Sequence, residues 1–157
     1  MAKFEMELPK ELMDNFTKLD KNSDEILGKM TEAGATAVWH NVKLFAPEVI
    51  KNHAKISKTY KTPTDGGINT KVYLSGYVPF SNPNRKFFSR YAKGRRYDTT
   101  KGVPVPFLAN MYEYGRSDAP FPKHPFFRKS FRNDQITQAM LDAQSEAWQD
   151  AGINPFE

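Results

Sequence analysis

The hydrophobic and polar residues of this chain alternate with two different periods, which predicts a fold of mixed strands and helices. Near the N-terminus, Phe4, Met6 and Leu8 of residues 3–8 alternate with charged residues, as is typical of a strand with one buried face. Pro9 ends this strand. A short amphipathic helix follows, with apolar residues three or four positions apart: Leu12, Phe16 and Leu19.

The longest predicted helix comes next. The polar residues 21–23 break the short helix, and Ser23 is suited to be the N-cap of the new one. From Ile26 onward, apolar and small residues recur at helical spacing. This stripe stops at Ala46 and Pro47, because the residue before a proline avoids the helical region. We therefore expect two separate helices before Pro47, the second one long.

The middle of the chain carries strand signals and one long loop. Residues 54–62 and residues 68–78 are strand-like, and residues 63–67 between them hold the aspartate and glycines of a turn, so we expect a β-hairpin. Residues 79–106 are rich in proline, asparagine, glycine and charge. Because they are too long for an ordinary connection, we expect a projecting insertion loop. Residues 107–114 then resume a strand-like pattern.

The last predicted element is a helix near the C-terminus. Its apolar residues recur at helical spacing: Ile136, Met140, Ala143, Ala147 and Trp148. Gly152 and Pro155 provide the stop. Two starts remain open, because Pro125 suits a first helical turn while Asn133 or Asp134 suits the cap of a later one.

Together these elements predict a single α+β domain over residues 1–157. We expect a small antiparallel sheet that carries the long N-terminal-half helix and the C-terminal helix on one face, with the basic loop at residues 79–106 projecting. No stretch approaches the roughly 20 apolar residues of a membrane helix, and the first residues lack the order of a secretory signal. The absence of cysteine removes disulfides and thiol catalysis and fits a cytosolic origin.

Charge is segregated along the chain, although the net charge is only +5. Residues 1–49 carry six Lys/Arg against nine Asp/Glu, residues 50–101 carry twelve against two, and residues 102–157 carry five against seven. Within the basic middle third, residues 85–97 alternate cations with aromatic residues, as would a strip that binds phosphates and stacks on bases. A solvated or partner-facing loop is the more common use of such a charge run, and no nucleic-acid module accompanies it.

The richest motif of the chain is an architectural joint. It runs from Tyr112 to Gly115 and continues through residues 120–128, which predicts a strand that stops at a glycine, a proline-stiffened linker and a helix that begins near Pro125. This motif supplies no nucleophile paired with a base, no phosphate-binding glycine loop and no set of metal ligands. The motif therefore favours a role in the shape and assembly of the protein over a catalytic role.

Other candidate chemistry is thin. His40, His53 and His124 lie far apart in the sequence and predict no metal site. Glu113, Asp118 and His124 can be drawn as the acid-base set of a nuclease, but Glu113 has no second carboxylate at a matching spacing. We therefore expect neither an enzyme nor a cofactor-binding protein.

At the joint, the sequence resembles a known family. Glu113-Tyr114-Gly115, followed by Pro122 and then by Pro125-Phe126, Arg128 and Ser130, is similar to the "E-aromatic-G … P-x-x-P-F-x-R-x-[AS]" signature of neck or tail-component proteins of long-tailed bacteriophages. That family includes proteins akin to the minor tail protein Z. The order of elements agrees with the family over residues 24–148: a long helix that ends in Ala-Pro, a basic hairpin, the signature segment and a closing helix.

The resemblance implies a non-enzymatic virion protein between the head and the tail, made in the bacterial cytoplasm and assembled as a ring of about six subunits. Its implied partners are further copies of itself and the tail-tube, tail-terminator and head-completion proteins, with passing contact with DNA and none with a membrane. A basic nucleic-acid-binding domain that uses residues 55–101 is the alternative.

Several residues are candidates for the assembly interfaces. We expect Glu113 to pair with an arginine across a subunit boundary and Gly115 to need a backbone geometry that a side chain would hinder. The full set of candidates joins the basic loop to the joint: Arg85, Lys86, Arg90, Arg95, Arg96, Glu113, Gly115, Pro125, Phe126 and Arg128.

Overall fold

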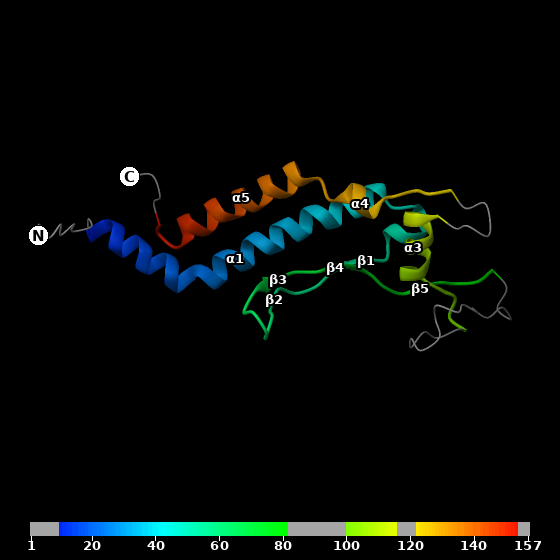
Figure 1. The fold of residues 1–157 in the computed structure, drawn as a ribbon, viewed down its shortest axis with the longest axis horizontal. Coiled ribbons are helices and arrows are strands. Elements are labelled where there is room, and N and C mark those ends of the chain that lie inside the picture. The colour runs from blue at the N-terminus through cyan, green and yellow to red at the C-terminus, as the bar shows by residue number, and fades with distance from the viewer. Residues whose placement is uncertain (1–9, 82–99, 116–121, 154–157) are drawn as a thin grey trace, which may run out of the picture.

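The computed structural model describes residues 10–81, 100–115 and 122–153. Its longest element is helix α1 (Lys10–Phe45), which runs along most of the molecule in Figure 1. Helix α5 (Asn133–Asp150) lies antiparallel beside α1, and a hairpin of short strands lies on the opposite side of α1. The prediction of an α+β fold is therefore confirmed, with α5 packed on α1 and small antiparallel sheets beside them.

α1 is one continuous helix, so the predicted break at residues 21–23 is wrong. Asn22 donates from Nδ2 to the carbonyl oxygen of Lys18 (2.9 Å), and Ser23 donates from Oγ to the carbonyl oxygen of Asp20 (3.0 Å). Because these polar side chains bond back to carbonyls of the preceding turn, the helix accommodates them without ending. The packing of α1 against α5 stabilises the continuous form.

The predicted end of the long helix is confirmed. α1 stops at Phe45, and Pro47 occupies the N-cap position of the short helix α2 (Glu48–Lys51). The proline disfavours a helical conformation at the residue before it, which explains the stop. The strand predicted for residues 3–8 lies outside the described residues.

The predicted hairpin is present as two pairs of short antiparallel strands. These strands are β1 (Ala54–Ile56), β2 (Tyr60–Lys61), β3 (Ile68–Asn69) and β4 (Val72–Leu74). β2 pairs with β3 beside the turn, and β1 pairs with β4 farther from it. Ala54 lies opposite Leu74, and both pack into the core with Val72. Since side chains alternate along a strand, Lys55 and Tyr73, which lie opposite each other next to these core residues, point outward and are exposed.

A third strand pair closes the base of the long loop. β5 (Tyr77–Val78) pairs in antiparallel register with β6 (Val103–Pro104). The predicted loop at residues 79–106 therefore extends too far at its C-terminal end, where β6 and then a helix already begin. Residues 82–99 of this loop lie outside the described residues.

Residues 107–114 belong to helix α3 (Val105–Tyr114), so the strand predicted there is wrong. The helix buries Val105, Ala109 and Glu113, which lie four positions apart and so share one helix face. A short apolar run fits a strand and a helix equally well by periodicity. The helix is favoured here because its buried face packs into the core.

The C-terminal helical region is divided into two helices, and the caps predicted for it are wrong: Pro125 precedes the N-cap Phe126 of the first helix, and Arg132, not Asn133 or Asp134, is the N-cap of the second. Helix α4 (Phe127–Ser130) forms one short turn, and α5 begins separately at Asn133. Phe131 between them leaves the helical region, with φ −86° and ψ 69°. α5 ends at Asp150, and Gly152 adopts a positive φ of 63°, in agreement with the predicted stop.

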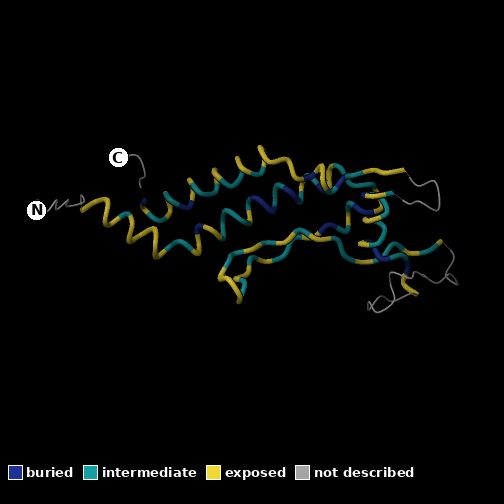
Figure 2. Tube along the Cα trace, viewed as in Figure 1, coloured by how far each residue is buried: buried dark blue, intermediate teal, exposed yellow. Residues whose placement is uncertain are grey.

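The main core lies where α1, α2, β1, α3 and the start of α4 meet. Figure 2 shows buried stretches in this region, whereas the N-terminal end of α1 is exposed. The buried residues of the cluster are Val38, Val42, Ile50, Ala54, Val105, Ala109 and Phe126. A second cluster of Ile26, Ala147 and Ile153 joins α1 to the end of α5. Among the described helices, none is long and apolar enough to span a membrane.

Gly102 should be the glycine least tolerant of substitution beside β5. Its φ is 133°, and a Cβ atom at this position would lie 2.1 Å from the carbonyl oxygen of Val78. Because that atom belongs to the backbone, Gly102→Ala must displace β5, and we expect a large loss of unfolding free energy in urea titrations.

Gly66→Ala is the matched control for this substitution. Gly66 also has a positive φ (69°), but its added Cβ would meet only the flexible side chain of Lys61, at 3.7 Å. We expect it to lose about 1–2 kcal/mol, the cost of a left-handed conformation alone. Equal losses for the two variants would contradict the role of the backbone overlap.

Candidate functional site

The residues of the joint motif converge where the end of α3 meets the start of α4 (Figure 1). Glu113, on the last turn of α3, is buried, with only 6% of its surface exposed. Phe126, which immediately precedes α4, is fully buried in the main core. A charged residue and an aromatic residue from separate parts of the chain thus form one interior unit.

The carboxylate of Glu113 is the centre of this unit. It accepts hydrogen bonds from the backbone N–H of Phe127 (3.0 Å) and from the backbone N–H of Arg128 (3.3 Å). It also accepts one from the side-chain Nε of Arg128 (2.8 Å). The first N–H groups of a helix have no partner within the helix, and the N-cap residue Phe126 has no side-chain acceptor. Glu113 therefore caps α4 from a different helix.

The partner expected for Glu113 was an arginine of a neighbouring subunit, and this expectation is wrong. The ion pair with Arg128 lies within one chain. The end of α3 and the start of α4 lie together, so the two residues meet although they are distant in sequence. The Arg128 side chain remains 65% exposed and lies over the ring of Tyr114, 5.2 Å from the ring centre. Glu113 is thus interior, while Arg128 also presents a surface.

The backbone around Glu113 is tied down at both ends of the linker. Gly115 ends α3 with its N–H donating to the carbonyl of Met111 (2.8 Å), and its φ of 76° lies in the region that favours glycine. On the return, the N–H of His124 donates to the carbonyl of Tyr112 (2.7 Å). Pro125 follows and is partly buried. The glycine geometry expected at Gly115 is present.

Phe126 is fixed by its own neighbours. The fully buried Ser130 donates from Oγ to the Phe126 carbonyl (2.7 Å), which closes the turn of α4. The ring of Phe127 packs edge-on against Phe126 (6.3 Å between ring centres) and Phe131 (5.5 Å). Phe126 is therefore a packing anchor in the interior of the molecule, where its side chain has no exposed surface.

The electrostatics of Glu113 reflect two opposing influences. Burial raises the pKa of its carboxyl, but the hydrogen bond from Arg128 and those from the two backbone N–H groups outweigh burial, so the pKa is lowered from its ordinary value. The carboxylate is therefore held in its charged form. A buried charge with three donors is a structural anchor rather than a general acid or base.

Of the remaining candidate residues, those that the structure describes do not gather into a second site. Arg85, Lys86, Arg90, Arg95 and Arg96 lie outside the described residues, as does Asp118. The histidines belong to different elements: the ring of His40 on α1 packs against Trp39, and the His53 ring lies 3.1 Å from the Ser75 carbonyl. Within the described parts of the chain, no group of three or more His, Cys, Asp or Glu residues is placed to hold a metal ion.

The structure also reveals an exposed surface that the sequence did not single out residue by residue. We call it the hairpin face, and its members are Lys55, Lys58, Tyr60, Lys71 and Tyr73. Lys55 lies directly opposite Tyr73 across the strand pair, and the Lys71 ammonium lies 4.8 Å from the centre of the Tyr60 ring. Lys71, which immediately precedes β4, and Tyr73 within β4 lie two positions apart, and this period-2 spacing is the sequence signal that marks the face.

Replacement of Glu113 by glutamine should destabilise the fold without changing side-chain volume. The amide can accept from one backbone N–H of α4, but it has no charge for Arg128 and presents an NH₂ group where a donor already lies. We expect a loss of about 1.5–3 kcal/mol in unfolding free energy, measured by urea titration at neutral pH. Glu146→Gln on exposed α5 is the control and should change stability little.

Acid should remove the same stabilisation. Because the folded-state pKa of Glu113 is lowered, its contribution is complete above the unfolded-state pKa of about 4.3 and is lost as the pH falls through the folded-state value. The difference in unfolding free energy between the wild type and Glu113→Gln should therefore shrink from pH 7 to about pH 3. A difference that stays constant over this range would contradict the charged role of Glu113.

Comparison with known proteins gave no match. No protein-family model, no curated protein and no solved structure is similar to this chain. The function proposed below consequently rests on the resemblance of the joint motif and on the geometry of the residues that form it.

Proposed function

We propose that this protein is a structural virion protein of a tailed bacteriophage, a neck or tail-completion component that joins head to tail through assembly into a ring. Its partners are further copies of the chain and the tail-tube, tail-terminator and head-completion proteins. The protein is made in the bacterial cytoplasm and ends in the virion. The proposal gives it no catalytic role and no cofactor.

One observation carries the proposal: the residues of the phage signature form a single hydrogen-bonded joint. Glu113 holds α4, Gly115 ends α3, and Phe126 anchors the joint in the core. The buried Ser130 of the motif also closes the turn of α4 through its hydroxyl. A motif that maintains the shape of a subunit fits an assembly protein better than an enzyme, whose motif would place reactive groups in a cleft.

The outer surface of the joint suits contact between proteins. Tyr114, Arg128 and Phe131 are 59%, 65% and 50% exposed respectively, and all three lie at the ends of α3 and α4. Tyrosine and arginine are enriched among the residues that dominate protein interfaces. Since Glu113 and the core hold this surface in place, it can dock on a neighbour with little loss of conformational entropy.

The hairpin face favours one other function, binding of nucleic acid by residues 55–101. Lysines beside exposed tyrosines can neutralise phosphates and stack on bases. This alternative requires affinity for random-sequence DNA that falls steeply as salt rises. Assembly into a ring does not require affinity for DNA.

The proposed function is tested in phage particles whose genome carries this gene. Mass spectrometry of purified virions should detect the protein in several copies per particle, and disruption of the gene should leave heads and tails unjoined in electron micrographs. Complementation with the wild type or with His124→Ala should restore joined particles, because the His124 side chain is exposed and only its backbone N–H serves the joint. Virions that lack the protein and form normally without it would refute the proposal.

A further inference from the structure

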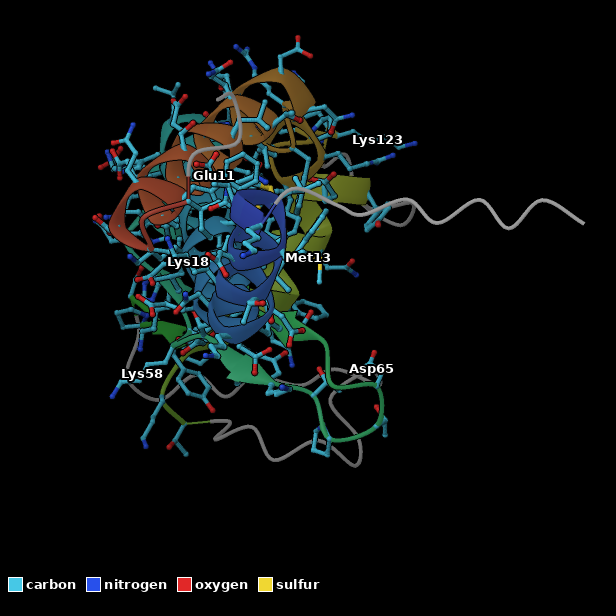
Figure 3. All side chains as sticks on the ribbon, turned by 90° about the vertical axis from the view of Figure 1, so that its left-hand side faces the viewer. Glu11, Met13, Lys18, Lys58, Asp65 and Lys123 are labelled. Carbon is cyan, nitrogen blue, oxygen red and sulfur yellow. The ribbon has the colours of Figure 1, made fainter. Side chains whose placement is uncertain are left out.

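The molecule presents two unlike charged surfaces on opposite sides of α1. The hairpin lies on one side of α1 and α5 lies on the other, so the outward surfaces of these two elements face away from each other (Figure 1). Figure 3 places Lys58 on the hairpin side, remote from α5. This arrangement means that a contact made by one surface leaves the other surface open.

The hairpin face is basic and partly aromatic. Tyr60 and Tyr73 are 36% and 44% exposed, and exposed lysines lie beside them. Lys61 is a different case, because it pairs with Asp24 of α1 at 2.7 Å and is therefore occupied within the subunit. Between residues 52 and 78 the only acidic residue is Asp65, which lies at the hairpin tip in Figure 3.

The outward surface of α5 has the opposite character. The sequence of α5 contains four acidic residues and no lysine or arginine. Asp150 pairs with Lys29 of α1 at 2.8 Å, and the others are exposed. Leu141 is 50% exposed next to Asp142 and gives the surface an apolar contact. We call this surface the α5 face, and its members are Asp134, Leu141, Asp142 and Glu146.

We propose that the hairpin face of one copy binds the α5 face of a second copy. This inference rests on the ring assembly in the proposed function and names the two surfaces that would form it. The lysines of one face meet the carboxylates of the other, and the exposed tyrosines meet Leu141. Aromatic and apolar groups within a charged rim are the usual anatomy of a protein interface.

A second copy accounts for both surfaces, whereas nucleic acid accounts for only one. Phosphates would be attracted by Lys55 and Lys71, but they would be repelled by the acidic α5 face. The exposed tyrosines of the hairpin face also have an apolar counterpart on the α5 face in Leu141. The occupant that the observations favour is therefore another subunit.

The contact is head-to-tail because the two faces differ. Each copy offers one face of each kind on opposite sides of α1, so association continues from copy to copy until the ends meet in a ring. Exposed ion pairs contribute little individually and are screened by salt. We therefore expect association that strengthens with protein concentration and weakens as salt rises.

Two charge-reversed variants of the full chain test the contact. Lys55→Glu with Lys71→Glu reverses the hairpin face, and Asp142→Lys with Glu146→Lys reverses the α5 face. Asp134 is left unchanged because an acidic residue favours the N-terminus of α5. Each double variant should sediment as a monomer in analytical ultracentrifugation at protein concentrations up to about 1 mM in low salt, where attraction between exposed charges is strongest.

Restoration of the charges separates the proposed contact from others. A mixture of the two double variants should associate, and so should the single chain that carries all four reversals, because both then have complementary opposite faces. A contact between like faces would associate in the mixture but not in the fourfold variant. Lys10→Glu with Lys21→Glu is the control for the same change of net charge at the exposed end of α1, and it should associate as the wild type does.

Three results would overturn the inference. They are a wild type that stays monomeric across the concentration range, a hairpin-face variant that still associates, and a fourfold variant that stays monomeric. A monomeric wild type that binds random duplex DNA through Lys55 and Lys71 would assign the hairpin face to nucleic acid instead. Circular dichroism melts confirm that each variant is folded.

The experiments distinguish failure of the proposed function from failure of this contact. If virions contain the protein and the fourfold variant fails to associate or to complement, the contact is refuted and the virion role stands. If virions lack the protein but the pattern of charge reversal and restoration holds in solution, the virion role is refuted and the contact stands.

Discussion

The structure depends on the hydrogen bonds that the buried carboxylate of Glu113 accepts from α4. A helix of four residues has almost no internal hydrogen bonds and does not persist without an external acceptor for its first N–H groups. Glu113 supplies this acceptor from α3, and Arg128 supplies the neutralising charge. Because the carboxylate is buried, loss of its partners would leave an uncompensated charge in the interior. The joint is therefore stable only when both helices are in place.

The consequences of this joint extend along the molecule. Once α4 is held, Phe126 is fixed in the core, and α5 follows α4 and runs antiparallel to α1. Gly34 of α1 permits close packing there, since a Cβ at that position would lie 3.0 Å from the side chain of Met140. With α5 on one side of α1 and the hairpin on the other, acidic and basic surfaces are kept apart. A subunit with two unlike, opposed surfaces is well suited to repeated head-to-tail contact.

Prediction from the sequence succeeded where the signals are local. Pro47 marks the end of α1, glycines and Asp65 mark the turn of the hairpin, and the spacing of apolar residues marks α5. It failed where packing outweighs local preference. Ser23 was predicted to start a helix but lies inside one, because its hydroxyl bonds back to a carbonyl. Residues 107–114 were predicted as a strand but form a helix, because the spacing of apolar residues in so short a run fits both structures.

The sequence by itself determined where α1 and α5 end, where the hairpin turns and which helix faces are apolar. Proline, glycine and the spacing of apolar residues act on the nearest few residues, so these features are local. The sequence also determined the unequal distribution of charge along the chain. Only the tertiary structure decided that Glu113 pairs with Arg128 of its own chain and that α3 is a helix. The same holds for the placement of α5 and the hairpin on opposite sides of α1. These features arise from contacts between residues distant in sequence, and their energies exist only after the chain has folded back on itself.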